Sequence, residues 1–409
     1  MPDIFELMNR FCPDGVPYYR LDQVFDILQG YSPSMDKKEY WEGGTVPFFR
    51  MENLKGDGCK LVATDTDMFC TMDSIRGKPF PGGSLIMATC ATIGVHALVC
   101  EDFLANRRFS VLKPAVFEPK IAGSRLKIAN EPLDMDFANY YAFELDKWCK
   151  DHINEGTFAQ VNMVGFRAFP WPVPPLQVQR EIVAILDKFD SYCNSMTAGL
   201  AGELEMRRKQ YRYWAEHLVM DGNVEMVELG KLCRINKGTQ MNKSDYQDGP
   251  YPIYNMGAEP SGTHTEYNRD IPSIVIAGHG NSCGFVNWVD EPFWAGGGCY
   301  YLDSLAPDLS NRYLYHAMKV REGFLMGLGS HGPIRHLYPR TIARLQVPVP
   351  VSVPGTGAWD IARQQSICDT LDKFLTLEHE LEHELELRRK QYEYYRDMLL
   401  SFPERKENA

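Results

Sequence analysis

Two copies of one sequence pattern decide the fold of this chain. The first copy has LDKF at Leu186–Phe189 and ELEMRRKQY at Glu203–Tyr211, and the second has LDKF at Leu371–Phe374 and ELELRRKQY at Glu384–Tyr392. Two unrelated surface helices would not share both runs in the same order. We therefore predict a chain with two equivalent halves.

Both copies have the periodicity of a long helix that is buried along one seam. Apolar residues recur in alternating steps of four and three, which is a heptad pattern. In the second copy this pattern extends from Ile367 to Phe402, and only Glu378 and Arg388 are polar. In the first copy two consecutive steps of four meet at Leu200, and such a stutter locally unwinds a supercoil.

Helices of roughly 40 residues would be about 60 Å long, because each residue adds about 1.5 Å along the axis. A helix of this length cannot bury its apolar stripe inside a small domain. We therefore predict that the two helices pack against each other or against helices of partner subunits. The residues expected in this seam or at a partner surface are Leu186, Phe189, Tyr211, Trp214, Leu371, Phe374, Leu381, Leu385, Tyr392 and Tyr395.

Length and composition indicate a globular protein with two or three domains. The chain has 409 residues, of which 44% are hydrophobic and 24% are charged. It has no apolar run long enough to span a bilayer, and charged residues interrupt Met1–Leu28 where a signal peptide would be apolar. The 11 cysteines are scattered without a Cys-x-x-Cys pair, which favours reduced thiols over a zinc site. We expect a cytoplasmic protein without a metal site.

The charge distribution limits how this chain could bind nucleic acid. A net charge of −11 argues against a simple nucleic-acid binder, whose binding surface is usually basic. Residues 229–348 are close to neutral, with 11 basic and 10 acidic side chains, whereas residues 363–409 have 8 basic and 11 acidic ones. Binding to DNA would require a local basic face or the charges of a partner.

Two β-rich segments alternate with the two helical patterns. Short runs such as Ser84–Ala88 are separated by Gly, Pro and Asp, as expected of strands and turns. Proline-rich segments precede each long helix and mark domain boundaries. The sequence predicts an α+β fold with a β-rich domain at 1–173, a spacer helix at 174–222, a second β-rich domain at 223–354, and a second spacer helix with a tail at 355–409.

The β-rich segments also match each other. Ser84–Ala88 aligns with Ser273–Ala277, and Pro47–Phe49 aligns with Pro252–Tyr254. The simplest fold for such a chain is a pseudo-two-fold arrangement in which two antiparallel coiled-coil helices separate the β-rich domains. Dimeric DNA readers hold two half-site modules at a fixed separation in this way. Two different modules in one chain would read an asymmetric, split sequence.

No motif predicts catalysis with any specificity. His379–His383 has the form H-E-x-x-H, which can bind zinc when it lies on a helix. Its Leu381 belongs to the heptad seam, so a repeated Glu/His/Leu helix surface is the better interpretation. Phosphate-binding G-x-x-x-x-G-K-[ST] and the Asn-Pro-Pro-aromatic run of amino-methyltransferases are absent from the sequence. We predict no catalytic residue.

Polar loops that contain glycine or basic residues are the candidates for DNA contact. Ala277–Gly284 and its counterpart Ala88–Gly94 follow strand-like runs, and small residues there permit close approach of the backbone. An ordinary turn or a solvated surface charge explains each of these residues as well. The candidates, which also come from the loops Lys237–Lys243 and Ser330–His336, are Arg50, Thr89, Thr92, Arg107, Lys237, Lys243, His279, Asn281 and Arg335.

Taken together, these features resemble the specificity (S) subunit of type I restriction-modification enzymes. The resemblance is carried by Pro174–Phe189, Glu203–Trp214, Gln364–Phe374 and Glu384–Tyr395. It implies target-recognition domains that each read half of a bipartite site in double-stranded DNA. It also implies helices that set the distance between the half-sites and dock two methyltransferase subunits. The linker Val353–Ile361 departs from the family's Pro-Pro-Leu, which affects how the second helix begins.

The resemblance further implies that this chain has no catalysis and no cofactor of its own. S-adenosylmethionine, ATP and magnesium would bind only to partner subunits, which include restriction subunits in the full complex. LDKF and ELE are 13 residues apart in the first copy and 9 in the second. Four residues of helix are about 6 Å, roughly two base-pair steps. The alternative is a coiled-coil scaffold or oligomerisation protein without a nucleic-acid role.

Overall fold

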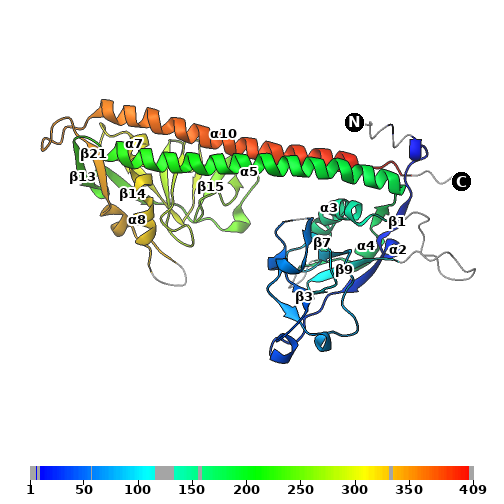
Figure 1. Ribbon diagram of the computed structural model, residues 1–409. Helices are drawn as coiled ribbons and strands as arrows, with labels where there is room; N and C mark the ends of the chain where they lie inside the picture. Colours follow the sequence, from blue (N-terminus) through cyan, green and yellow to red (C-terminus); the bar gives the residue numbers. More distant parts are fainter. Residues whose placement is uncertain are drawn as a thin grey trace, which may run out of the picture. The chain divides into compact units, whose positions relative to one another are not determined.

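The computed structural model describes Glu6 and residues 10–56, 58–115, 133–154, 159–330 and 335–404. The chain forms two compact units, and each unit combines segments that are distant in sequence (Figure 1). The first unit comprises Met1–Met196 and Leu387–Ala409, and the second comprises Thr197–Glu386. None of the helices in the described part is long and apolar enough to cross a membrane.

Two long helices dominate the secondary structure, as the heptad pattern predicts. Helix α5 spans Leu176–Met220 and helix α10 spans Ile361–Leu400. Before α5 the chain is held extended by prolines, and after it Gly222 adopts a φ of 78°, a conformation that commonly ends helices. Asp360 begins α10, because its carboxylate accepts a hydrogen bond from the N–H of Arg363 at 2.9 Å. The second helix therefore starts without the Pro-Pro-Leu of the first.

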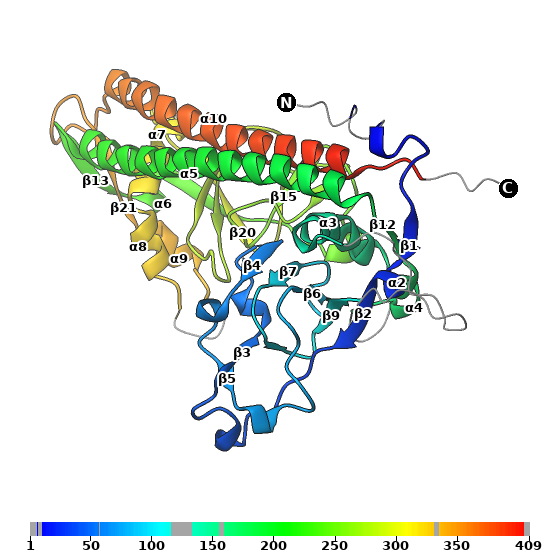
Figure 2. The same cartoon turned by 45° about the vertical axis from the view of Figure 1, so that its right-hand side comes forward.

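In its described residues the first unit contains a five-stranded sheet, a three-stranded sheet, two strand pairs and the helices α2, α3 and α4. The large sheet has the order β2-β9-β6-β7-β4, and Figures 1 and 2 both show α3 between this sheet and the long helices. The strands are β1 Tyr18–Arg20, β2 Phe25–Gln29, β3 Val46–Phe49, β4 Cys59–Leu61, β5 Phe69–Cys70, β6 Ser84–Ala88, β7 His96–Val99, β8 Leu104–Ala105, β9 Phe109–Pro114, β10 Ile153–Asn154, β11 Gln160–Val161 and β12 Pro170–Pro172; the helices are α2 Leu21–Val24, α3 Met135–Asp151 and α4 Met163–Ala168.

The second unit repeats this plan with a four-stranded sheet of order β14-β20-β17-β18. Its strands are β13 Val224–Glu228, β14 Cys233–Lys237, β15 Tyr251–Tyr254, β16 Thr263–His264, β17 Ser273–Ala277, β18 Val286–Val289, β19 Trp294–Ala295, β20 Cys299–Ser304 and β21 Gln346–Pro350; its helices are α6 Leu229–Leu232, α7 Asn311–Val320, α8 Glu322–Gly327 and α9 Pro339–Ala343.

The strand pairing shows that the two units are diverged copies of one fold. The orders β2-β9-β6-β7 and β14-β20-β17-β18 correspond, and so do β5-β3-β8 and β16-β15-β19. Within them Ile27 pairs with Leu112, and its counterpart Ile235 pairs with Leu302. Strand β4 occurs only in the first of these sheets and α8 has no counterpart in the described part of the first unit. The prediction of a duplicated two-domain α+β fold is confirmed.

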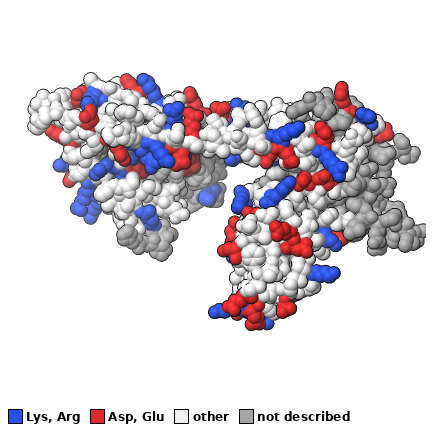
Figure 3. Space-filling model, viewed as in Figure 1, with Lys and Arg blue, Asp and Glu red and all other residues white. Residues whose placement is uncertain are grey.

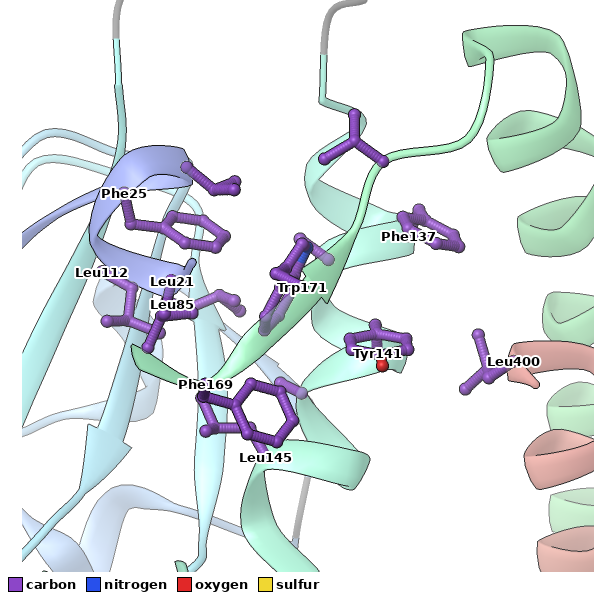
Figure 4. Packing of buried hydrophobic residues seen from close by; sticks show 14 of the residues in the cluster. Leu21, Phe25, Leu85, Leu112, Phe137, Tyr141, Leu145, Phe169, Trp171 and Leu400 are labelled. Carbon is purple, nitrogen blue, oxygen red and sulfur yellow. The ribbon is translucent and has the colours of Figure 1, made fainter. Parts of the chain in front are cut away.

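In the first unit, aromatic residues join the β-rich domain to both long helices. Figure 4 shows Trp171 between Phe25 and Tyr141, with Leu400 of α10 beyond Tyr141. The ring of Trp171 is 5.0 Å from that of Phe25 and 4.9 Å from that of Tyr141. The start of α5 enters the same core through Val178, Ile182 and Leu186. Each apolar side chain of this size contributes about 1.5–3 kcal/mol when it is fully buried.

The second unit buries the opposite ends of the same helices. Tyr211, Ala215 and Val219 come from the end of α5, and Ile367 and Leu371 come from the start of α10. In each unit the two helix segments run antiparallel, because residue numbers rise along one and fall along the other at their contacts. Arg208 thus pairs with Glu382 at 2.5 Å and Arg363 with Asp221 at 2.9 Å.

Candidate nucleic-acid interface

Both units end the first strand of the main sheet in the same way. Gln29 ends β2 and Lys237 ends β14, and a glycine follows each. A Cβ on Gly30 would lie 2.2 Å from the carbonyl oxygen of Asn106, and one on Gly238 would lie 2.1 Å from that of Gly296. Both positions therefore require glycine. The loops that follow leave equivalent edges of the two sheets.

A basic cavity opens at this edge in the first unit. Its volume is about 980 Å³, and its lining combines the cations Arg76 and Lys78 with the aromatic rings of Tyr31 and Phe80. Arg76 and Lys78 are exposed and have no ion pair within the described residues. Free cations beside aromatic rings suit a phosphodiester chain and its bases. Tyr31 comes from a different loop than Arg76, Lys78 and Phe80, and the sequence pattern did not identify this combination.

The candidates predicted in the first unit do not form one cluster. Thr89 is 6% exposed, and its hydroxyl lies 3.1 Å from that of Ser110. Arg50 pairs with Glu52 at 2.5 Å and with Asp67 at 3.7 Å. Thr92 and Arg107 are exposed. The carbonyl of Arg107 accepts a hydrogen bond from Gln29 at 2.8 Å, which places this turn at the edge described above.

A strained residue lies in the loop that contains Thr89 and Thr92. Ala91 has a φ of 70°, and among the described residues it is the one non-glycine with a left-handed φ. Its counterpart is Gly280, which has a φ of 78°. Both loops close through the same backbone contact, since Gly94 donates to Ala88 at 3.1 Å and Gly284 to Ala277 at 2.8 Å. The second unit thus has a relaxed version of the same turn.

Several predicted residues do come together in the second unit. The Nδ1 atoms of His279 and His336 lie 2.8 Å apart, so at most one of these nitrogens carries a proton. Burial lowers the pKa of His279, and the nearby His336 and Lys237 lower it further. Since Nδ1 is engaged by His336, His279 offers Nε2 to a ligand, and the lowered pKa favours its neutral form.

The other candidates in this unit differ in whether their side chains are free to contact DNA. Arg335 donates from Nη2 to the carbonyl of Met326, while its own carbonyl accepts from Gly280 at 3.0 Å. Lys237, Lys243 and Asn281 are exposed. Residues 331–334 of the predicted Ser330–His336 loop lie outside the described residues.

The second unit also has a basic groove, which was not predicted from the sequence. Arg340, Thr341 and Arg344 line it together with Phe324 and other apolar residues, and its volume is about 460 Å³. Figure 3 shows Lys and Arg atoms, in blue, gathered over the part of the second unit that carries α8 in Figure 1. The first unit has the uncharged Val164 and Ala168 at the matching places in α4. Basic charge is therefore distributed differently on the two units.

The predicted seam residues divide into buried and exposed groups. Leu186, Leu371 and Tyr211 are buried, and the rings of Phe189 and Tyr395 lie 5.7 Å apart in a tilted arrangement. Trp214 is 45% exposed, because Ala215 and Val219 face the core in its place. The packing thus continues from Tyr211 in steps of four and leaves the heptad. The remaining members of the set are partly buried: Phe374, Leu381, Leu385 and Tyr392.

Large apolar side chains remain exposed at equivalent positions of the two long helices. Met206 of α5 is 60% exposed, and its counterpart Leu387 of α10 is 50% exposed. Tyr213 and its counterpart Tyr394 are 55% and 66% exposed. On each helix the tyrosine lies seven positions after the methionine or leucine, so both side chains point to one side of that helix. Each helix therefore presents the same apolar patch.

His379 and His383 lie exposed on α10. In the part of the chain that the structure describes, no three residues of the types His, Cys, Asp and Glu are arranged to hold a metal ion.

Comparisons with known proteins identify the family. The family model described as type I restriction modification DNA specificity domain matches residues 13–206 and 221–387, and the chain belongs to this family. It is 30% identical over 382 residues to the type I restriction enzyme EcoprrI specificity subunit of Escherichia coli, which covers 89% of both chains.

A further relative and a solved structure also match this chain. The EcoR124I/EcoR124II specificity subunit of Escherichia coli is 30% identical over 260 residues, 57% of this chain and 61% of that one. A solved structure described as concerning complex assembly and conformational transition of the type I R-M system has a TM-score of 0.57 at 14% identity, with 94% and 96% of the two chains covered; it has the same fold. The chain is a specificity subunit, the non-catalytic component of a type I restriction-modification system.

Proposed function

We propose that this chain is the sequence-specific DNA-recognition subunit of a cytoplasmic type I restriction-modification complex. Each β-rich domain reads one half of a bipartite target, and the long helices set the gap between the halves. The observation that carries this proposal is the duplication, because two copies of one domain expose polar and basic loops at the same sheet edge. The domains that we propose are those predicted from the sequence, at 1–173 and 223–354.

The target is asymmetric in this proposal because the two edges carry different side chains. Gln29 in the first unit corresponds to Lys237 in the second, and Cys90 corresponds to His279. Base edges in the major groove are distinguished by their donors and acceptors. Different side chains at equivalent positions would therefore read different sequences.

The proposed DNA contacts combine predicted residues with those that the fold adds. We propose direct contacts from Thr92, Arg107, Lys237, Lys243, His279 and Asn281, together with Arg76 and Lys78 at the cavity. The polar groups of Arg50, Thr89 and Arg335 already bind protein atoms. We propose that these three hold the reading loops in shape.

The repeated apolar patches suit two copies of one partner. Met206 and Tyr213 on α5 match Leu387 and Tyr394 on α10 in residue type and exposure. Exposed aromatic and apolar side chains of this kind form the centre of many protein interfaces. We propose that each patch docks one methyltransferase subunit, and that restriction subunits join the full complex. S-adenosylmethionine, ATP and magnesium would then belong to these partners.

A binding experiment with the assembled complex tests this proposal. DNA that contains the bipartite site should bind roughly a thousandfold or more tightly than scrambled DNA, and the affinity for both should fall as salt rises. Replacing Arg76 and Lys78 with Gln should weaken binding to all sequences and reduce the salt dependence. Equal affinity for all DNA sequences would contradict the proposal and favour a coiled-coil scaffold.

A further inference from the structure

A buried glutamine connects the start of α5 to the domain helix of the first unit. Gln179 is 0% exposed, and its Oε1 accepts a hydrogen bond from the backbone N–H of Asp134 at 2.7 Å. Asp134 is the N-cap of α3. The side-chain amide of Gln179 also donates to the carbonyl of Pro174 at 2.7 Å. One amide thus binds both the domain helix and the chain that enters α5.

The second unit makes the same joint with the matching residue of α10. Gln364 is 1% exposed, and its Oε1 accepts from the N–H of Ser310 at 2.9 Å. Ser310 is the N-cap of α7, the counterpart of α3. The amide of Gln364 donates to the carbonyl of Asp308 at 3.2 Å. The two glutamines occupy the same place in the repeated pattern, eight residues before the Asp of LDKF.

That aspartate makes a second contact with the same domain helix. In the first unit Asp187 accepts from the hydroxyl of Tyr140 at 2.7 Å. In the second, Asp372 lies 2.8 Å from Nε2 of His316 and accepts from Nε of Arg312 at 2.8 Å. Tyr140 and His316 both come six residues after their N-cap. The joint is therefore duplicated at both of its contact points.

Two contacts fix what a single contact leaves free. The Gln and Asp positions are about 12 Å apart along the long helix, and their partners are about 9 Å apart along the domain helix. The apolar core that contains Val178, Ile182 and Leu186 also joins the two helices in the first unit, but apolar contacts are not directional, and one hydrogen bond would add a single fixed point. The Gln and Asp contacts occur in the same order along both helices. Together they fix the position of the domain helix along the long helix and the angle between the two helices.

We propose that Gln179 and Gln364, together with Asp187 and Asp372, are positioning residues that hold each recognition domain at one orientation on its long helix. They thereby make the complex accept a single gap length between the half-sites. This inference rests on the proposed function. The helices would supply the length between the half-sites, and the joints would keep each domain from tilting to reach a site with a longer or shorter gap.

Replacing Gln364 with Met in the complete complex tests the inference. Methionine has a similar length and shape but leaves the N–H of Ser310 without its buried acceptor. After co-expression with the methyltransferase partner, modified sites would be mapped by methylation-sensitive sequencing. The half-sites should stay the same, while modification at gaps one base pair longer or shorter should rise roughly tenfold relative to the native gap. Gln179→Met should act in the same way.

Exposed glutamines of the same helices provide matched controls. Gln177→Met and Gln365→Met change the same residue type one or two positions away, where the side chain is exposed, and should leave the gap unchanged. Should the Met variants fail to fold, Tyr140→Phe removes only the hydroxyl that binds Asp187 and should relax the gap to a smaller degree.

Equal loss of modification at every gap length, without relaxation, would show a purely structural role and overturn the inference, even if the thermal midpoint fell. Absence of any bipartite motif in the wild-type complex would instead refute the proposed function, and the inference with it.

Discussion

At the scale of single residues, Ala91 shows how the two copies have diverged. Its left-handed φ of 70° is shared by Gly280 at 78°, so one backbone turn is built from alanine in one unit and glycine in the other. The left-handed conformation costs a residue with a Cβ about 1–2 kcal/mol. The first unit therefore holds strain in a loop that we propose lies at the DNA.

Replacing Ala91 with Gly should stabilise the chain by about 0.5–1 kcal/mol, because relief of strain outweighs the greater freedom of glycine in the unfolded state. Gly280→Ala should have the opposite sign and similar size, since no atom lies within 4 Å of the added Cβ. Denaturant midpoints of the two variants would measure both effects. A destabilised Ala91→Gly variant would contradict this reading of the turn.

His316 makes the second unit sensitive to acid. Burial lowers its pKa to about 4, although the hydrogen bond to Asp372 acts in the opposite direction. Its Nδ1 lies 3.0 Å from the hydroxyl of Tyr211, which fits a neutral ring that donates from Nε2. An unfolded histidine has a pKa near 6.5. As pH falls from 6.5 towards 4, the unfolded chain binds a proton on this residue that the folded chain does not.

The contribution of His316 to the free energy of unfolding should therefore be fully present well above pH 6.5. Below pH 6.5 the free energy of unfolding should fall by up to about 1.4 kcal/mol per pH unit. Thermal midpoints of the wild type and of His316→Gln, measured from pH 7.5 to 4.5, isolate this contribution, because glutamine does not titrate. The exposed His383→Gln variant should follow the wild type. Identical slopes for the wild type and His316→Gln would show that folding does not lower the pKa of His316.

At the scale of secondary structure, α5 carries four-residue steps at its centre. Thr197–Leu200 and Ala201–Leu204 are two tetrads that each end in leucine. Gly199 and Gly202 lie within them, and a Cβ at either position would meet no atom within 4 Å. Side-chain atoms can therefore be added at these two glycines without a clash.

A second copy of Ala201–Leu204 inserted after Leu204 should lengthen the proposed spacing. Four residues add about 6 Å, so the gap should grow by one or two base pairs while both half-sites stay the same. Methylation mapping of the insertion variant would measure this. As a control of equal length to the wild type, Gly199→Ala with Gly202→Ala should stabilise the helix by roughly 1 kcal/mol per site and leave the gap unchanged. An unchanged gap in the insertion variant would mean that α5 does not set the distance.

The helices and the duplication could be predicted from the sequence because their signals extend over many residues. The heptads specify α5 and α10, and the matching runs Ser84–Ala88 and Ser273–Ala277 are equivalent strands. Trp214 is exposed and Ala215 and Val219 pack into the second unit in its place, so of the two predicted locations a partner surface remains for Trp214. Which side of α5 is buried at this point depends on the residues that pack against it. The heptad pattern of the helix alone does not reveal those residues.

The site could be predicted only in part for the same reason. The loop with His279 follows a strand in the sequence, and that local signal was sufficient to predict its place after β17. The burial of Thr89 and the ion pairs of Arg50 depend on residues elsewhere in the chain. The Arg76 cavity likewise combines several loops, so single-sequence patterns gave no reason to select it.

At the scale of the whole molecule, an acidic chain has local basic surfaces. The net charge is −11, yet basic side chains gather at the Arg76 cavity and at the groove of Arg340 and Arg344. Long-range repulsion of DNA would oppose binding by the isolated chain. We expect tight binding once partner subunits contribute their own charges.

Exchanging residues 1–173 for those of a related specificity subunit should change one half-site and leave the other half-site and the gap as they were. The reason is that the two units have separate cores and separate reading edges. Sequencing of modified sites would decide this, and a change in both half-sites would refute independent reading.

The most direct test is to co-express this chain with its methyltransferase partner and map modified adenines across the host genome. We predict one asymmetric, bipartite motif with a single gap length. Modification of a continuous motif, or modification unrelated to sequence by an intact complex, would contradict the claim that two duplicated domains read the two halves of one target.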